Sequence, residues 1–213
     1  MDKLKYTYAF FFLLAAVSVF AALTAEQVIE RVQNSVQTEK PLRVKFQQVF
    51  EWQVTGKVEK LDGEMLLDGL NKFRIVTPDQ TVVSNGETMW TYSRLEDQVI
   101  IDNVTNDPQT LMPRDILFTY PETYNATLWK PGTELDGEPA AALRMTPKDK
   151  NQMMQELKVW VSKETWHPLQ VEFTDMNKNT TSYQINSVTV DTTISAEAFT
   201  FEPNENTEVI DVR

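Results

Sequence analysis

The sequence predicts a mainly β (α+β) protein whose strands form a curled antiparallel sheet or a partly closed barrel of about ten or eleven strands. Three observations predict this fold class. After Pro41, apolar and polar residues alternate with a period of two, as in a strand with one dry face. Turn-forming pairs such as Asp68-Gly69 recur at short intervals. Helical segments do not alternate with the strands, which argues against a parallel βαβ sheet.

The first 25 residues are typical of a cleavable secretory signal peptide. Two lysines precede an apolar run from residue 9 to residue 23, which is shorter than the roughly 20 residues of a transmembrane helix. Small residues at its end allow cleavage after Ala21 or after Ala25. We expect residues 26–213 to form one domain that is exported and soluble after cleavage.

A short amphipathic helix is expected next. Thr24 and Gln27 match a capping box, in which each residue bonds to the backbone of the other. Apolar residues then recur at every fourth position, at Val28, Val32 and Val36. These spacings predict a helix of about a dozen residues.

Alternation predicts a long strand over residues 42–54, and turn residues divide residues 68–94 into three strands of a meander. Asn85-Gly86 indicates a two-residue hairpin turn of type I′, which needs positive φ at both central residues. We also interpret four other glycine positions as turns: Gly56, Asp62-Gly63, Gly132 and Asp136-Gly137.

Further strands are expected at residues 97–102, 124–130, 141–147, 156–162, 169–175 and 180–192. One apolar segment interrupts this series. Pro108 and Pro113 can each begin a helical turn, and Pro121 ends the segment. Such a short apolar helix needs a dry surface to lie against, and with the first helix it could cover the mouth of the curled sheet.

Composition and motifs exclude several functions. The chain has 31 acidic and 20 basic residues, a net charge of −11, which argues against nucleic acid as a partner. It has no cysteine, which excludes disulfides and a lipid-modified cysteine. The single histidine, His167, is expected in a turn, and neither G-x-S-x-G nor H-E-x-x-H occurs. We expect no catalytic residue, metal or cofactor, although plentiful carboxylates leave a carbohydrate-active enzyme as an alternative.

Several short motifs occur in an order and spacing typical of one protein family. They are the aromatic-x-Gln pair Phe46 and Gln48, the KFR strand at 72–74, PDQTVVSNG at 78–86, W-x-Y at 90–92, QV at 98–99 and the closing FTFEPNENTEVID at 199–211. After the signal peptide, nearly the whole chain thereby resembles the periplasmic outer-membrane lipoprotein carrier family, the LolA type.

That resemblance implies an unclosed β-barrel with short helices forming a lid over a hydrophobic cavity. It implies a periplasmic carrier, expected to be a monomer, that takes acylated lipoproteins from an inner-membrane lipoprotein-releasing ABC exporter. The carrier would deliver them to the outer membrane or to a receptor there. The best-known members have a basic residue that hydrogen-bonds the lid; here the equivalent position falls near Gly69, with Lys72 and Arg74 close by.

The expected acyl-chain site consists of aromatic and aliphatic residues of the early strands: Phe46, Trp52, Met65, Leu67, Phe73, Ile75, Trp90 and Tyr92. The expected lid residues are Leu111, Met112, Ile116 and Leu117. Ordinary core packing is the alternative for all of them. An envelope-stress sensor or interaction domain on the same fold, which binds a partner protein or lipid, is the alternative function.

Whether the apolar residues of 68–94 line the cavity depends on which way the faces of two strands point. Phe73 and Ile75 share one face of their strand, and Trp90 and Tyr92 share one face of theirs. If both faces are concave, the apolar residues of this stretch line the cavity.

Overall fold

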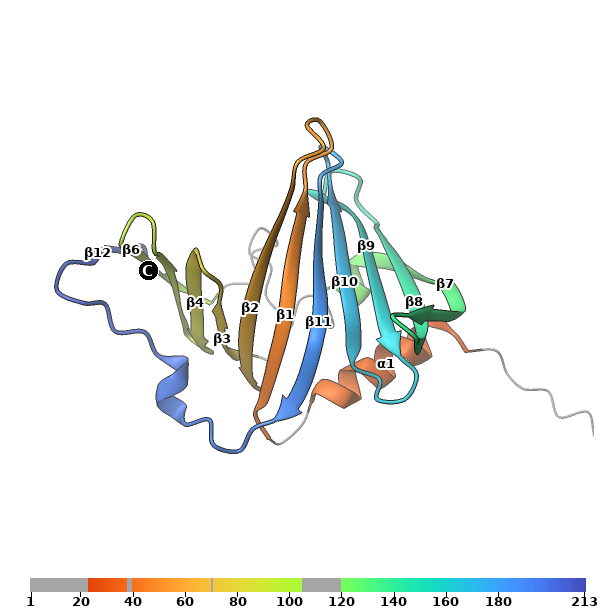
Figure 1. Ribbon diagram of the computed structural model, residues 1–213, viewed down its shortest axis with the longest axis horizontal. Helices are drawn as coiled ribbons and strands as arrows, with labels where there is room; N and C mark the ends of the chain where they lie inside the picture. The colour runs from red at the N-terminus through yellow and green to blue at the C-terminus, as the bar shows by residue number, and fades with distance from the viewer. Residues whose placement is uncertain (1–22, 38–39, 70, 105–119) are drawn as a thin grey trace, which may run out of the picture.

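A large β-sheet dominates the computed structural model, which describes residues 23–37, 40–69, 71–104 and 120–213 (Figure 1). Within these residues twelve strands lie side by side in the order β12-β6-β5-β4-β3-β2-β1-β11-β10-β9-β8-β7. The sheet is not closed, because β12 and β7 stand at its two ends. The predicted fold class is confirmed, with twelve strands where about ten or eleven were expected.

The elements have the following bounds: α1 Ala25–Val36, β1 Leu42–Glu51, β2 Val58–Asp68, β3 Lys72–Val76, β4 Gln80–Asn85, β5 Thr88–Ser93, β6 Gln98–Asn103, α2 Tyr120–Thr123, β7 Tyr124–Leu135, β8 Glu138–Pro147, β9 Met154–Ser162, β10 Pro168–Asp175, β11 Thr180–Val190, the 3-10 helix η2 Ala196–Phe199, and β12 Glu208–Asp211. Neighbouring strands are antiparallel except β12, which runs parallel to β6. The six strands predicted after residue 96 are present as β6 to β11, whereas β12 was not predicted.

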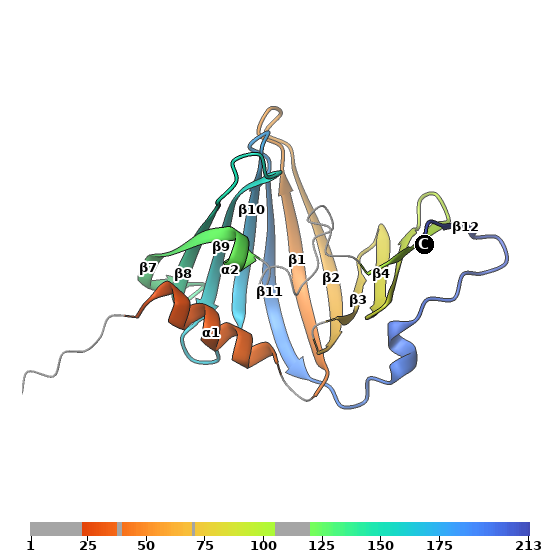
Figure 2. The ribbon, with the colours of Figure 1, turned by 180° about the vertical axis from the view of Figure 1, so that it is seen from behind.

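Helix α1 lies on one side of the sheet, and the strands curl around that side, which we call the inner face (Figure 2). The capping box is confirmed, because Thr24 Oγ1 accepts the Gln27 N–H at 3.3 Å and the Gln27 side chain accepts the Thr24 N–H at 3.1 Å. Val28 and Val32 are buried among inner-face residues of β7 to β10 that include Leu143, Val159, Val171 and Phe173. No helix in the described part of the chain is long and apolar enough to cross a membrane.

The hairpin between β4 and β5 is present, but its turn is not of type I′. Gly86 has a φ of 98°, whereas Asn85 is the last residue of β4 and is not in the positive-φ region. The two connecting residues are therefore Gly86 and Glu87, and a glycine in first position fits type II′. The Asn85 side chain instead accepts the backbone N–H groups of Glu87 and Thr88, at 2.9 and 2.8 Å.

Two glycines that we predicted in turns lie inside strands. Gly63 is in the middle of β2, directly opposite Phe46 of β1. A Cβ at Gly63 would lie 2.4 Å from Cζ of Phe46, so the ring rests on the glycine backbone. Gly132 lies in β7, where the pairing with β8 shifts register.

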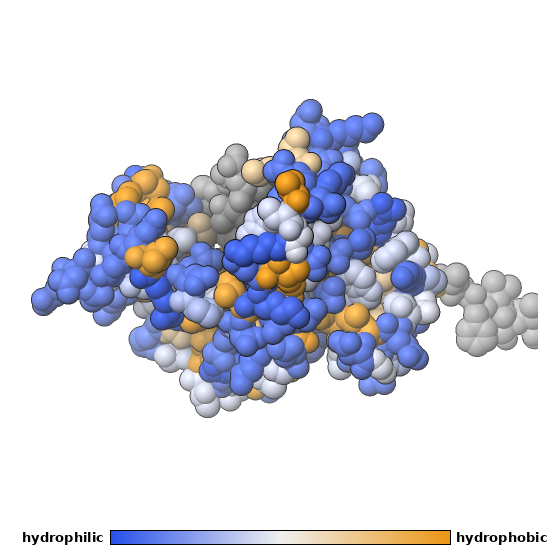
Figure 3. Space-filling view, turned by 45° about the horizontal axis from the view of Figure 1, so that its top comes forward, coloured by the Kyte–Doolittle hydropathy of each residue, from blue (hydrophilic) through white to orange (hydrophobic). Residues whose placement is uncertain are grey.

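The outer face of β8 to β10 has a network of charged residues on a mostly hydrophilic surface (Figure 3). Lys158 pairs with Glu172 at 2.8 Å and with Glu156 at 3.2 Å, and Arg144 pairs with Glu156 as well. Burial alone would raise the pKa of Glu156, but its hydrogen bonds to Arg144 and Lys158 outweigh burial and hold the pKa below its ordinary value of 4.5. Ionised Glu156 therefore stabilises the folded state.

We predict that Glu156→Gln lowers the free energy of unfolding by about 1–2 kcal/mol at pH 7, because two charge-assisted hydrogen bonds lose their anion. The pKa of Glu156 is lower in the folded state than in the unfolded state, where it is near 4.5. The ionised carboxylate therefore contributes its full stabilisation above pH 4.5, and this stabilisation is lost as the pH falls through the pKa of the folded state. Urea unfolding at pH 7 and at pH 3 checks this, with Glu205→Gln, at an exposed position, as the control. A difference from the unmodified chain that is as large at pH 3 as at pH 7 would contradict the assignment.

Candidate functional site

The register of the first three strands lines up apolar side chains on the inner face. In one row Leu42 of β1 is opposite Leu67 of β2, which is opposite Phe73 of β3. In the next row the corresponding residues are Val44, Met65 and Ile75. Residues paired in this way lie on the same face of a sheet. Two rows of aliphatic and aromatic side chains therefore cross β1, β2 and β3.

The burial of these residues is uneven. Leu42, Val44, Phe46 and Phe73 are buried, with exposed fractions of 2–4%. Met65, Leu67 and Ile75 are only half-buried. The part of the rows on β2 and β3 therefore offers apolar surface that the described residues do not fully cover.

Phe46 joins these rows to the core under α1. Its ring lies 5.7 Å from the ring of Tyr183 of β11, which in turn lies 6.2 Å from Phe173 of β10. Phe173 belongs to the core that packs against α1. Burial at this junction raises the pKa of Tyr183. The inner face is thus one continuous apolar surface from α1 to β3.

Five of the eight predicted site residues share this face: Phe46, Met65, Leu67, Phe73 and Ile75. Trp52 does not lie between the strands but follows β1 at the turn into β2. There its ring is 4.1 Å from Phe50, and Lys57 lies 5.0 Å from the ring. The predicted long strand ends at Glu51, and the turn after it is closed by the Gly56 N–H, which donates to the Trp52 carbonyl at 2.8 Å.

Trp90 and Tyr92 lie on the outer face, opposite to the expectation. Trp90 pairs with Val83, which pairs with Arg74, and Arg74 alternates with the inward-facing Phe73. Alternation along one strand shows which residues share a face, but only the register between strands shows which face that is. Trp90 and Tyr92 are therefore not brought together with the other predicted residues, and we omit them from the proposed site.

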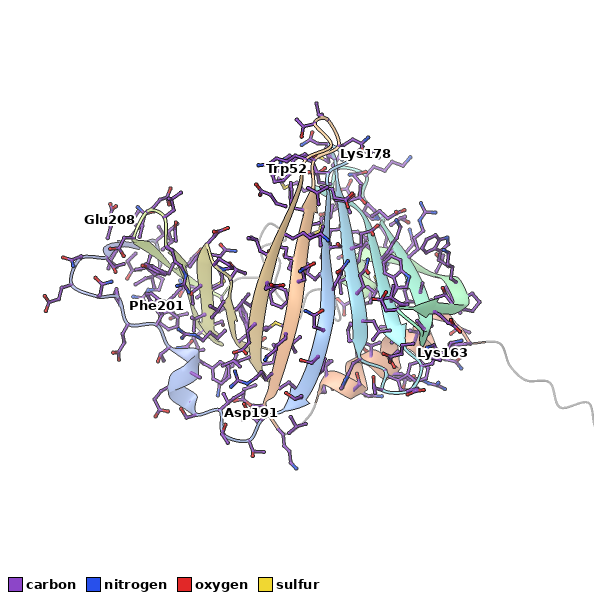
Figure 4. All side chains as sticks on the ribbon, in the orientation of Figure 1. Trp52, Lys163, Lys178, Asp191, Phe201 and Glu208 are labelled. Carbon is purple, nitrogen blue, oxygen red and sulfur yellow. The ribbon has the colours of Figure 1, made fainter. Side chains whose placement is uncertain are left out.

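The C-terminal segment, residues 191–211, packs against the outer face of β3 to β5 through η2 and Phe201 and then joins the edge of the sheet as β12 (Figure 4). Phe199 is buried, and the ring of Phe201 lies 5.1 Å from Tyr92. Nη1 of Arg74 donates to the carbonyl of Ala198 at 3.3 Å and to that of Thr200 at 3.2 Å. Arg74 of β3 thus holds the C-terminal segment. Phe199 and Phe201 thus form a second core on the outer face of these strands. The F-x-F spacing at 199–201 was the sequence pattern that could have indicated it.

Asp97 fixes the end of the same segment. Its carboxylate accepts the hydroxyls of Tyr92 and Thr207, each at 3.0 Å, and its carbonyl accepts the Glu208 N–H at 2.9 Å. The hydrogen bond to Asp97 raises the pKa of Tyr92. The pairing of β12 with β6 begins directly after these contacts.

The predicted lid residues, Leu111, Met112, Ile116 and Leu117, lie outside the described residues. His167 occupies the turn between β9 and β10, as predicted. Its Nε2 lies 3.3 Å from the carbonyl of Ser35 at the end of α1, and Arg31 lies over the ring of Trp166. The turn therefore holds the end of α1. No group of three or more potential metal ligands occurs among the residues that the structure describes.

An open antiparallel sheet with an amphipathic helix on a dry inner face defines the class as an open-barrel binding fold. The family described as outer membrane lipoprotein carrier protein LolA matches residues 37–202. This match covers more than half of the chain, so the chain belongs to the LolA family. The family consists of periplasmic lipoprotein-binding proteins and not of enzymes.

The solved structures to which this chain is similar are distant in sequence. An uncharacterized conserved protein from Thermus thermophilus has a TM-score of 0.61 and 14% identity over 88% of this chain and 98% of that one. MucB has a TM-score of 0.50 and 16% identity, covering 87% of this chain and 65% of that one. A LolA superfamily protein from Nitrosomonas europaea has a TM-score of 0.45 and 14% identity, over 84% and 99%. Curated protein sequences contain no match to the chain.

We predict that Gly63→Ala displaces the Phe46 ring and lowers the free energy of unfolding by about 1–3 kcal/mol, as overpacking does. Gly132→Ala is the matched control, because a Cβ there meets nothing within 4 Å in a strand of the same sheet. Chemical denaturation measures the stability of both variants, and a crystal structure locates the ring. A stability loss at Gly63 no larger than at Gly132 would contradict the close contact.

Proposed function

We propose that this protein is a periplasmic carrier that binds the acyl chains of lipoproteins released from the inner membrane and delivers them to the outer membrane. The half-buried apolar surface of Met65, Leu67 and Ile75, next to buried Phe46 and Phe73, is the observation that supports it most strongly. Membership of the LolA family supports the same function. These five residues are our proposed acyl-chain site.

The energy of acyl-chain burial suits such a carrier. At roughly 0.8 kcal/mol per buried CH₂, a chain of about fifteen carbons contributes about 12 kcal/mol, which corresponds to a nanomolar Kd. Release therefore requires that part of this free energy be offset, for example by the work of opening a cover over the site. An inner-membrane ABC exporter as donor, and the outer membrane or a receptor there as acceptor, are part of the proposal.

Export of the chain is also proposed, and the capping box supports cleavage after Ala21 over cleavage after Ala25. Cleavage after Ala21 leaves Thr24 in place, whereas cleavage after Ala25 removes the residue that caps α1. Loss of an N-cap threonine costs about 1 kcal/mol of helix stability. We therefore predict that the mature chain starts at Ala22. The intact mass of protein purified from the envelope checks this, and a mature chain that starts at Glu26 would contradict it.

Adjacent residues on β3 allow a matched test of the site. Ile75 faces inward opposite Met65, whereas its neighbour Val76 faces outward, and both are half-buried. Ile75→Asn places an amide against the acyl chain, where an unpaired polar group costs about 1–3 kcal/mol. We predict that Ile75→Asn weakens binding of a fluorescent palmitoylated peptide tenfold or more, while Val76→Asn changes it less than twofold. Fluorescence anisotropy with the mature chain measures both Kd values.

Equal losses in the two variants would contradict the assignment of the site to the inner face. The function itself would be contradicted if the unmodified chain bound no acylated peptide and native mass spectrometry detected no lipoprotein or lipid bound to protein from its own envelope. Capture of a partner protein in place of an acyl chain would then favour the sensor alternative.

A further inference from the structure

Three connections meet at one end of the sheet: residues 52–57 between β1 and β2, residues 148–153 between β8 and β9, and residues 176–179 between β10 and β11. The Gln53 N–H donates to Oδ1 of Asn179 at 3.2 Å, which joins the first connection to the third. The Met176 N–H donates to the Met153 carbonyl at 3.1 Å, which joins the third to the second. Figure 4 shows both Trp52 and Lys178 at this end of the sheet. We call these three connections the apex.

Each connection of the apex exposes one large apolar side chain. The exposed fractions are 91% for Val54, 66% for Met153 and 57% for Met176. Single exposed apolar residues are common on protein surfaces. Here one occurs on each of three connections that hydrogen bonds join at one end of the sheet.

The charge of the apex is opposite to that of the chain. Its three connections contain four lysines and one aspartate, a formal charge of +3, whereas the whole chain has −11. Lys57 lies over the half-buried ring of Trp52, while Lys150 and Lys178 are exposed. A tip with apolar residues, an aromatic ring and lysines on an acidic protein is suited to a surface that is both apolar and anionic.

The apex is also continuous with the proposed acyl-chain site. Phe46, Gln48 and Phe50 alternate along the inner face of β1, and Phe50 contacts Trp52 at the start of the apex. An acyl chain that leaves Phe46 along β1 therefore arrives at the apex.

We propose that the apex is a membrane-contact surface. Val54, Met153 and Met176 enter the interface of a bilayer, the ring of Trp52 lies at headgroup level, and Lys150 and Lys178 contact anionic headgroups. This inference deepens the proposed function and rests on it for its biological meaning. Binding to a bilayer can nevertheless be measured with no lipoprotein present, so the two proposals fail separately.

The test is sedimentation of the mature chain with vesicles of phosphatidylglycerol and phosphatidylethanolamine. We expect binding that weakens in high salt and on pure phosphatidylcholine vesicles, because the lysines contribute about fivefold each at an anionic surface. The triple variant Val54→Ser, Met153→Ser, Met176→Ser should bind at least tenfold more weakly. The control replaces three exposed apolar residues elsewhere, Leu95→Ser, Val209→Ser and Val212→Ser, and should bind like the unmodified chain.

A second pair of variants tests the charge. Lys150→Gln with Lys178→Asn should weaken binding at least tenfold, and asparagine suits the φ of 66° at position 178. Lys45→Gln with Lys130→Gln, both exposed and outside the apex, is the control. All variants should bind the palmitoylated peptide with an unchanged Kd, which shows that they fold. Absent binding of the unmodified chain to anionic vesicles, or equal losses in an apex variant and its control, would overturn the proposal.

Discussion

The contact between the Phe46 ring and Gly63 is the constraint on which the inner face depends. A larger residue at position 63 would exclude the ring, and the ring connects the core under α1 to the apolar rows of β1 to β3 through Tyr183. Under α1 the dry surface is filled by the protein's own side chains. Beyond Phe46 it continues on residues such as Met65 that are only half-buried. The boundary between core and proposed binding surface therefore lies at the middle of the sheet.

The two ends of the sheet are stabilised in different ways. Strands β7 to β10 pack against α1 on the inner face, and their outer face has a charged network around Glu156. Strands β3 to β5 are also dry on the outer face, where Phe199 and Phe201 of the C-terminal segment pack. The second core packs against the outer face of β3, opposite to the proposed acyl-chain site. A ligand bound on the inner face would therefore contact strands whose other face is already packed.

Local patterns were enough to predict most elements. Period-two alternation located the strands, and the capping box at Thr24 located α1, because both depend on neighbouring residues alone. The face of Trp90 could not be predicted, since it depends on the register of three hairpins in succession. Asp62-Gly63 is a pair typical of a turn, but Gly63 lies inside β2, where the absence of a side chain leaves room for the ring of Phe46. Because Phe46 is distant in sequence, the local pattern could not indicate this role. Five of the predicted site residues share a face because they lie on β1, β2 and β3, which are consecutive both in the sequence and in the sheet.

The pairing of β1 with β11 has a consequence for how the chain folds. Leu42 lies opposite Val190, so the central strand obtains one of its two neighbours from the far end of the chain. The edge strand β12 pairs with β6 across a similarly long separation in sequence, with Glu208 opposite Gln98. Folds rich in such distant contacts form slowly, because loop closure precedes any gain from pairing. Strands β1 to β6 and strands β7 to β11 each pair with neighbours in sequence, so these two parts of the sheet can form separately. The apolar rows beside β1 remain without one side of their sheet until β11 pairs with β1.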